Sequence, residues 1–461
     1  MSLRNLLHAV LLTCVLTGFC RMAESAEPED PTASLEAVAP AEDHEKAKAE
    51  EQASVHGQTT YIRQFKPGFP ADYSGPKSLS ASPEHGYSWT ATLSFGLRLW
   101  QGASVYFDPE LLQGVAFSNS QGLGGLANAE LAKAADANPT IYRARLFLRQ
   151  EFGLGGGSEA VEPAIHKLAG QQDKRRIVLT AGNFSVLDVF NSLEYAHDPR
   201  TEFFNTSFAS HASFDYPADA RGYTWGAALE YIDDEWAVRL GRFLQPREPN
   251  GLQLDTRLLE HYGDMLELEH GYDISGQAGK IRVLVWRNHA HMGAFSDALA
   301  LAARTGSPPD VGEVRREHAK VGVGVSLEQK IGEALGIYVR ADWADDKTES
   351  YAFTEVGRSA SAGGILHGGG WGLPMDGIGL AAAINGLSPE HRAYLAAGGL
   401  GGFLGDGQLR YGPEQVLEAF YSFRPVPHLY ISPDIQFIRH PGYNRDRGPA
   451  RVYGIRAHAQ F

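Results

Sequence analysis

Arginine and glutamate side chains recur at alternate positions of several short segments, where they could bind a polar solute. Side chains alternate across a β-strand, so this spacing would place such groups on one face of each segment. Guanidinium and carboxylate groups can hydrogen-bond to sugar hydroxyls, and an aromatic ring can cover the apolar face of a pyranose. The candidate solute-contacting residues are Arg143, Arg145, Arg149, Glu230, Arg282, Trp286, Arg340 and Glu418. The alternative for each charged residue is a solvated salt bridge that touches no solute.

The same segments have a second face that is apolar. In residues 87–99 one face is polar, and the other carries Tyr87, Trp89, Ala91, Leu93, Phe95, Leu97 and Leu99. Comparable alternation occurs at 142–152, 280–286, 320–328 and 335–343. Further candidate strands lie at 102–108, 176–183, 224–232, 235–243, 265–272, 350–356, 364–371, 377–384, 416–423, 429–437 and 452–461. The total is 16 strands, and an even number is typical of bacterial outer-membrane barrels.

The last ten residues form the most distinct of these candidate strands. Tyr453, Ile455 and Phe461 lie on one face, whereas Arg456 and His458 lie on the other. Outer-membrane barrels close with such a strand, whose lipid-facing residues include aromatic side chains. We therefore predict an all-β fold, a transmembrane antiparallel β-barrel of about 16 strands with an aqueous lumen. The alternative for this segment alone is the final strand of a soluble sandwich.

The amino terminus predicts export. Arg4 precedes a short apolar run, and the small residues Ser25 and Ala26 follow it, as in a secretory signal peptide. The two cysteines, Cys14 and Cys20, both lie inside this segment, so the mature chain would have no disulfide and no thiolate site. We expect residues 1–26 to be the signal peptide.

The next segment is strongly acidic. Residues 27–55 hold nine acidic and two basic residues, and residues 56–86 are rich in Gly, Pro and Ser. We expect 27–85 to be a largely disordered periplasmic segment and 86–461 to be the barrel domain. Ser388, Pro389 and Gly398 have the spacing of a helix cap, first turn and end, which predicts a loop helix between two late strands.

Composition excludes several function classes. The net charge is −14, which does not suit a nucleic-acid-binding chain. The glycine-rich stretches at 122–126 and 363–370 do not lead into a helix with Lys-Ser or Lys-Thr, so they are not phosphate loops. We expect no enzyme activity, no cofactor and no metal.

Several ordered blocks resemble a known family. They include Gly102–Gly114, Gly124–Glu130, His211–Gly226, Leu387–Leu395, Asp406–Glu414 and His440–Pro449. Together they resemble the carbohydrate-selective porins of the OprB type over about residues 85–461. The resemblance implies a 16-stranded outer-membrane barrel that passes monosaccharides by facilitated diffusion.

The resulting hypothesis is a sugar channel with a weak binding constriction, since a tight site would slow exit. Two alternatives remain open: a general or anion-selective porin, which the arginines would favour, and an occluded structural barrel. The expected partners are carbohydrate solutes, outer-membrane lipid and lipopolysaccharide, and the barrel-assembly machinery, which would bind the strand ending at Phe461. Homo-oligomerisation is an open expectation.

Overall fold

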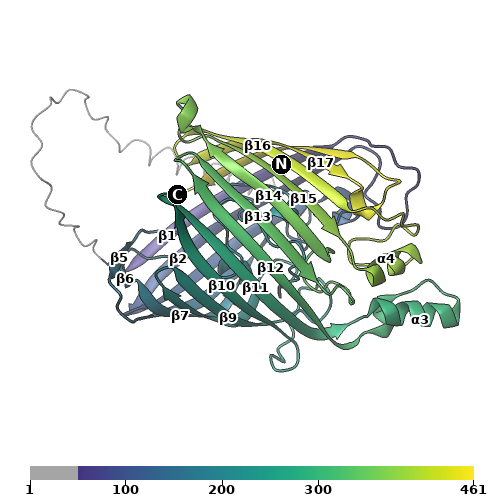
Figure 1. Cartoon of the computed structure of the whole chain (residues 1–461), viewed down its shortest axis with the longest axis horizontal. Helices are drawn as coiled ribbons and strands as arrows, with labels where there is room; N and C mark the ends of the chain where they lie inside the picture. Colours follow the sequence, from purple (N-terminus) through teal and green to yellow (C-terminus); the bar gives the residue numbers. More distant parts are fainter. Residues whose placement is uncertain (1–49) are drawn as a thin grey trace, which may run out of the picture. The chain divides into compact units, whose positions relative to one another are not determined.

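A computed structural model describes residues 50–461, and within this range sixteen antiparallel strands close into a barrel (Figure 1). The first eight are β1 (Ala53–Lys66), β2 (Glu84–Trp100), β3 (Ala103–Val115), β4 (Thr140–Gly153), β7 (Arg175–Phe184), β8 (Thr224–Asp233), β9 (Trp236–Leu244) and β10 (Tyr262–Ile274). The others are β11 (Gln277–Met292), β12 (Arg316–Ile331), β13 (Leu335–Ala344), β14 (Arg358–His367), β15 (Gly377–Gly386), β16 (Glu414–Val426), β17 (Leu429–Arg439) and β18 (Ala450–Gln460). The all-β barrel prediction is confirmed.

The barrel closes between the first and last strands. β1 pairs with β18 from Gln58↔Gln460 to Phe65↔Tyr453, so the carboxyl-terminal strand completes the ring. Connections at one end are mostly tight turns, such as residues 234–235 and 275–276, whereas those at the other end are long. Outer-membrane barrels have short periplasmic turns and long extracellular loops. The long connections therefore mark the extracellular end.

Alternation along the strands separates a lipid-facing surface from the lumen. In β18 the side chains of Tyr453 and Ile455 are 42% and 49% exposed, whereas Arg456 and His458 are buried inside. The apolar face of β2 is likewise exposed at Leu93, Phe95 and Leu97. Apolar groups on the outside and polar groups on the inside reverse the arrangement of a soluble protein, as a bilayer requires.

Two sequence expectations about strands are corrected. β1 lies within residues 27–85, which were expected to precede the barrel, and its alternation was hidden among Gly, Gln and Thr residues. Residues 350–356 form no strand, because the backbone amides of Tyr351, Ala352 and Phe353 donate to the Asp215 carboxylate. One missed strand and one false strand cancelled, which is why the total of sixteen was right. Residues 1–49, with the predicted signal peptide and most of the acidic segment, lie outside the described residues.

Helices and a small hairpin occupy the connections. The helices are α2 (Thr206–Ala209), α3 (Phe295–Thr305) and α4 (Pro389–Ala396), and β5 (Ser158–Val161) pairs with β6 (Gly170–Asp173) at the opposite end of the barrel from α3 and α4 (Figure 1). The predicted loop helix is confirmed as α4: Ser388 Oγ accepts from the His391 amide at 3.1 Å. No helix in residues 50–461 is long and apolar enough to cross a bilayer.

Candidate functional site: the lumen cavity

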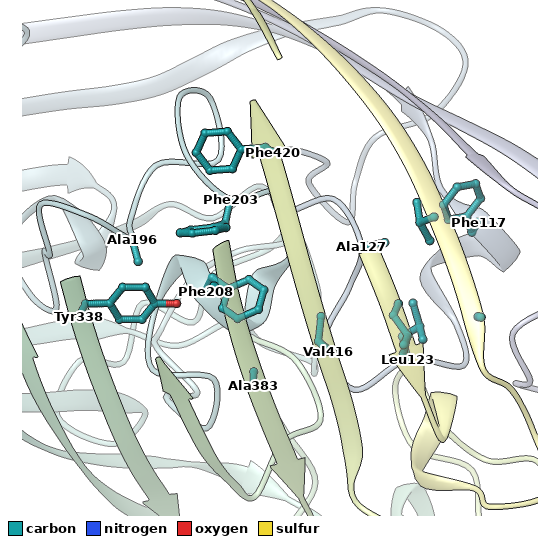
Figure 2. Close-up of a cluster of buried hydrophobic side chains, with 14 of the residues drawn as sticks. Phe117, Leu123, Ala127, Ala196, Phe203, Phe208, Tyr338, Ala383, Val416 and Phe420 are labelled. Atoms are coloured by element: carbon teal, nitrogen blue, oxygen red, sulfur yellow. The ribbon is translucent and has the colours of Figure 1, made fainter. Parts of the chain in front are cut away.

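The connection between β7 and β8, residues 185–223, folds into the barrel; we call it the lumen segment. Its Phe203 and Phe208 are buried and lie among Tyr338 of β13 and Phe420 of β16 (Figure 2). Glycines on the wall permit this close approach: a Cβ on Gly324 or Gly336 would lie 2.5 Å from the His211 ring or 2.2 Å from the Tyr195 ring. The lumen segment therefore packs against the inner wall as a fixed part of the fold.

Buried arginines of the wall hold the carbonyls of the lumen segment. Arg340 of β13 donates to Phe208 O at 2.5 Å and to Ala196 O at 2.6 Å. Arg456 of β18 donates to Glu202 O at 2.6 Å and to Thr201 O at 2.9 Å. Each bond satisfies a carbonyl that lacks a strand partner, which is required of buried backbone.

Buried carboxylates of the wall hold amides of the same segment. Glu418 of β16 accepts from the amides of Phe204 and Asn205, the latter at 2.9 Å. Glu328 of β12 accepts from the Glu194 amide at 2.7 Å, and Asp342 of β13 accepts from the Ser213 amide at 2.8 Å. Charged groups on this part of the wall thus position the lumen segment.

A cavity of about 600 Å³ remains between the lumen segment and the strands β1–β4. Wall residues such as Gln58, Thr92 and Glu110 line it, and so do Arg200 and Tyr223 of the lumen segment. The long connections after β3 and β13 also contribute lining residues, as does the turn that carries His166. This volume suits a small polar molecule.

An ion network around Arg145 lines one part of the cavity. Its guanidinium binds both oxygens of Asp188 at 2.7 Å, and its Nη1 lies 3.4 Å from Asp108 Oδ2. The same Asp108 oxygen is 2.7 Å from His166 Nε2. Asp108 Oδ1 has no hydrogen-bond partner among residues 50–461. That oxygen is buried, so it would reach a solute hydroxyl only after the Asp108 side chain moves.

A second network is centred on Arg200 of the lumen segment. Arg200 Nε lies 2.8 Å from Glu130 Oε1, and Nη2 lies 3.1 Å from Glu110 Oε2. Glu110 also accepts from the hydroxyls of Tyr142, at 2.5 Å, and Tyr223, at 3.3 Å. The two tyrosine rings lie with centroids 6.1 Å apart. Charged groups and tyrosine hydroxyls therefore meet at Glu110.

One lysine in the cavity has no carboxylate partner within residues 50–461. Lys133 Nζ, in the β3–β4 connection, donates to Asn250 Oδ1 and to Ala352 O at 2.5 Å. Burial lowers the pKa of Lys133 to about 7, because desolvation disfavours its charged form. The charge of the cavity therefore changes near neutral pH.

The eight residues predicted from the sequence do not form one site. Arg145 and Arg149 line the cavity. Glu230 pairs with Arg239 at 2.9 Å, and Arg282 pairs with Glu269 at 2.6 Å and with Glu328, all on the wall away from the cavity lining. Trp286 is buried against Phe214, and Arg340 and Glu418 hold the lumen segment. The eighth residue, Arg143, is not on the inner wall.

Arg143 lies on the outer face, which corrects its expected inward position. β3 residues Asp108 and Pro109 pair with Arg145 and Arg143, so Ala144 is an extra residue that shifts the alternation. Pro109 lacks the amide that a regular ladder needs, which explains the bulge. The Arg143 guanidinium consequently lies 5.2 Å from the ring centroid of outward-facing Trp225.

Several cavity residues have no distinguishing signal in the strand alternation. Asp108, Glu110, Glu130 and Tyr223 fall inside the blocks that carry the family resemblance, but alternation alone gave them no role. Arg200 lies in a long connection without periodicity. The family resemblance could therefore have pointed to Asp108, Glu110, Glu130 and Tyr223, but not to Arg200.

Comparisons with known proteins concern the family and the fold. The sequence model of one protein family, described as carbohydrate-selective porin, OprB family, matches residues 77–461. The high-pH structure of Pseudomonas putida OprB is similar, with a TM-score of 0.69 and 17% identity over 89% of this chain and 94% of that chain. The outer membrane channel DcaP of Acinetobacter baumannii gives a TM-score of 0.49 and 12% identity over 90% of this chain and 99% of that chain. No curated protein sequence matches. The chain belongs to the OprB family of carbohydrate-selective porins.

Proposed function

We propose that the carbohydrates carried by this outer-membrane porin are monosaccharides, which cross through the lumen cavity by diffusion. The observation that carries the proposal is charge balance: the lining holds six Asp and Glu and six Lys and Arg residues. A neutral solute then meets many hydrogen-bonding groups and little net field. An anion channel would need an excess of positive charge.

The two networks supply a weak site rather than a tight one. Arg145 and Arg200 are already paired with carboxylates, so a sugar hydroxyl competes with existing ion pairs and gains little net free energy. Tyr223 lines the cavity beside Glu110, and the hydroxyls of Tyr142 and Tyr223 both donate to that carboxylate. Weak, multi-point contact is compatible with fast exit.

Liposome swelling tests the proposal. We expect the purified chain to admit glucose clearly faster than gluconate, which has a similar size and a negative charge, and faster than a disaccharide. Equal rates for glucose and gluconate would contradict charge balance as the basis of selectivity. No entry of any of the three solutes would instead support an occluded barrel.

Export and partners complete the proposal. Residues 1–26 act as a signal peptide and residues 27–49 as part of an acidic periplasmic segment; sequencing the mature amino terminus should find Ala26 or Glu27. The strand ending at Phe461 is the contact for the assembly machinery, and outer-membrane lipid surrounds the exposed apolar face. Association into homo-oligomers is testable by light scattering in detergent.

A further inference from the structure

Arginines gather on the outer surface at the extracellular end of the barrel. Outward, exposed arginines occur on six strands, each toward the end where the long connections begin: Arg63, Arg143, Arg287, Arg358, Arg439 and Arg451. A seventh, Arg242, pairs with Asp264 at 2.7 Å. A charged side chain on the lipid-facing surface is costly near the bilayer midplane and costs little near the interface. Their common level therefore marks the headgroup region.

The densest part of this belt lies where β17 and β18 meet. Arg451 is opposite Phe437, and Arg439 lies two residues beyond Phe437 on the same face. Diagonal neighbours of this kind have Cα atoms about 7–8 Å apart, so two guanidinium groups can converge on one anion. Arg63 follows on β1, the next strand of the barrel.

Neither member of the pair has an ion-pair partner within residues 50–461. The ion pairs of the described chain do not include Arg439 or Arg451, and no side-chain hydrogen bond satisfies either guanidinium there. Asp446, in the connection between β17 and β18, pairs with Arg410 at 2.5 Å instead. Two unpaired cations at a lipid interface leave a local positive charge that an anion can neutralise.

An apolar surface lies directly below the pair. Phe437 and Tyr453 are 37% and 42% exposed on the same outward face, and Ile435 and Ile455 continue it toward the periplasmic end. Cations above exposed aromatic and aliphatic groups match a molecule with an anionic head and acyl chains.

We propose that Arg439 and Arg451 bind the phosphate of an acylated, phosphorylated lipid in the outer leaflet, whose chains lie on Phe437 and Tyr453. Arginine binds phosphate through several charge-assisted hydrogen bonds, which favours a phosphate monoester over a zwitterionic headgroup, whose single phosphodiester charge is offset by its own ammonium group. The site needs an outer-membrane location but not sugar passage, so the two proposals can fail separately.

The opposite rim provides a matched control. Arg175 at the start of β7 is exposed on an outward position at the periplasmic end, and its guanidinium donates to Leu154 O at 3.1 Å. Replacing it removes an outward arginine without touching the pair.

The test uses the full chain in detergent, titrated with diphosphoryl lipid A and with lipid A that lacks both phosphates, and read by native mass spectrometry. We expect the wild type to prefer the diphosphoryl lipid, R439Q/R451Q to lose about tenfold in affinity for it, and R175Q to bind like the wild type. Glucose swelling should be unchanged in both variants, which shows that they fold and that the lumen is intact.

Three outcomes would overturn the proposal: equal binding of the two lipids, equal binding by R439Q/R451Q and wild type, or an equal loss in R175Q. Displacement of the lipid by millimolar inorganic phosphate would also overturn it, since the pair would then be a site for free phosphate rather than for a lipid.

Discussion

The two sides of the inner wall carry the same residue types and use them differently. On β8–β13 the inward charges pair with one another or hold the lumen segment, as Glu230, Arg282 and Arg340 do. On β3 and β4, Glu110 and Arg145 line the cavity. Inward and outward side chains alternate along the strands of both sides, apart from the bulge at Ala144. What differs is where the lumen segment packs, and that position decides which charges can meet a solute.

The largest expected effect comes from removing an anchor of the lumen segment. Arg340→Met leaves the buried carbonyls of Ala196 and Phe208 without donors, which should lower the free energy of unfolding by about 3 kcal/mol. Thermal unfolding in detergent measures it, and single-channel recording should show a larger, noisier conductance.

The matched control for that prediction is Arg149→Met on the cavity side. Arg149 is partly exposed and pairs with Glu151 at 3.0 Å, so its loss should cost about 1 kcal/mol or less. Similar decreases in the free energy of unfolding of the two variants would contradict the proposed difference between the two sides of the wall.

The next effect is on solute selection. Arg200→Gln leaves Glu110 and Glu130 without their cationic partner, so the cavity becomes net acidic. We expect glucose flux to fall by about fivefold, because the weak site loses a charge-assisted donor, and the pore to favour cations. Swelling rates and reversal potentials measure the two changes; Arg257→Gln, whose partner Asp255 lies outside the cavity lining, should change neither.

A smaller effect separates two arginines that are two residues apart. Arg145→Gln should slow glucose entry by about threefold, since Arg145 lines the cavity, whereas Arg143→Gln should leave it unchanged because Arg143 lies outside. Swelling assays on the two variants compare them directly. A loss with Arg143→Gln equal to that with Arg145→Gln would contradict the bulge at Ala144.

The smallest effect is pH dependence. The lowered pKa of Lys133, about 7, means that this side chain is charged below pH 7 and neutral above it. Raising the pH from 6 to 8 should therefore remove a positive charge from the cavity and shift selectivity toward cations by less than about twofold. Lys133→Met has no such charge at either pH, so the shift measured by reversal potentials should be smaller in this variant. An identical shift in both proteins would contradict its assignment to Lys133.

The fold was predictable because lipid on one side and polar groups on the other impose a period of two. The clean alternation of 87–99 and 452–461 located β2 and β18. The Tyr351–Val356 segment shows the limit: its residue types suit a strand, but Asp215, 136 positions away from Tyr351, takes its amides. A local sequence pattern cannot show that a residue so distant in the chain will accept hydrogen bonds from these backbone amides.

The site was less predictable for a related reason. Alternation assigns a face only while the ladder is regular, and the bulge opposite Pro109 separates Arg143 from Arg145. Alternation also does not predict which segment covers the inward face of a strand. Trp286 does point inward, yet Phe214 of the lumen segment covers it. A role for Arg200 depends on the three-dimensional path of a connection that has no period.

Closure of β1 on β18 has a consequence for biogenesis. The two strands are the ends of the described ring, and until they meet each presents a row of unpaired backbone groups. The lumen segment also depends on late residues. Glu418 and Arg456, which hold it, belong to the last third of the chain. Neither the wall nor its filling can be completed while synthesis or export is in progress. Contacts of such long sequence separation form slowly, so the chain needs protection from self-association until its carboxyl terminus arrives.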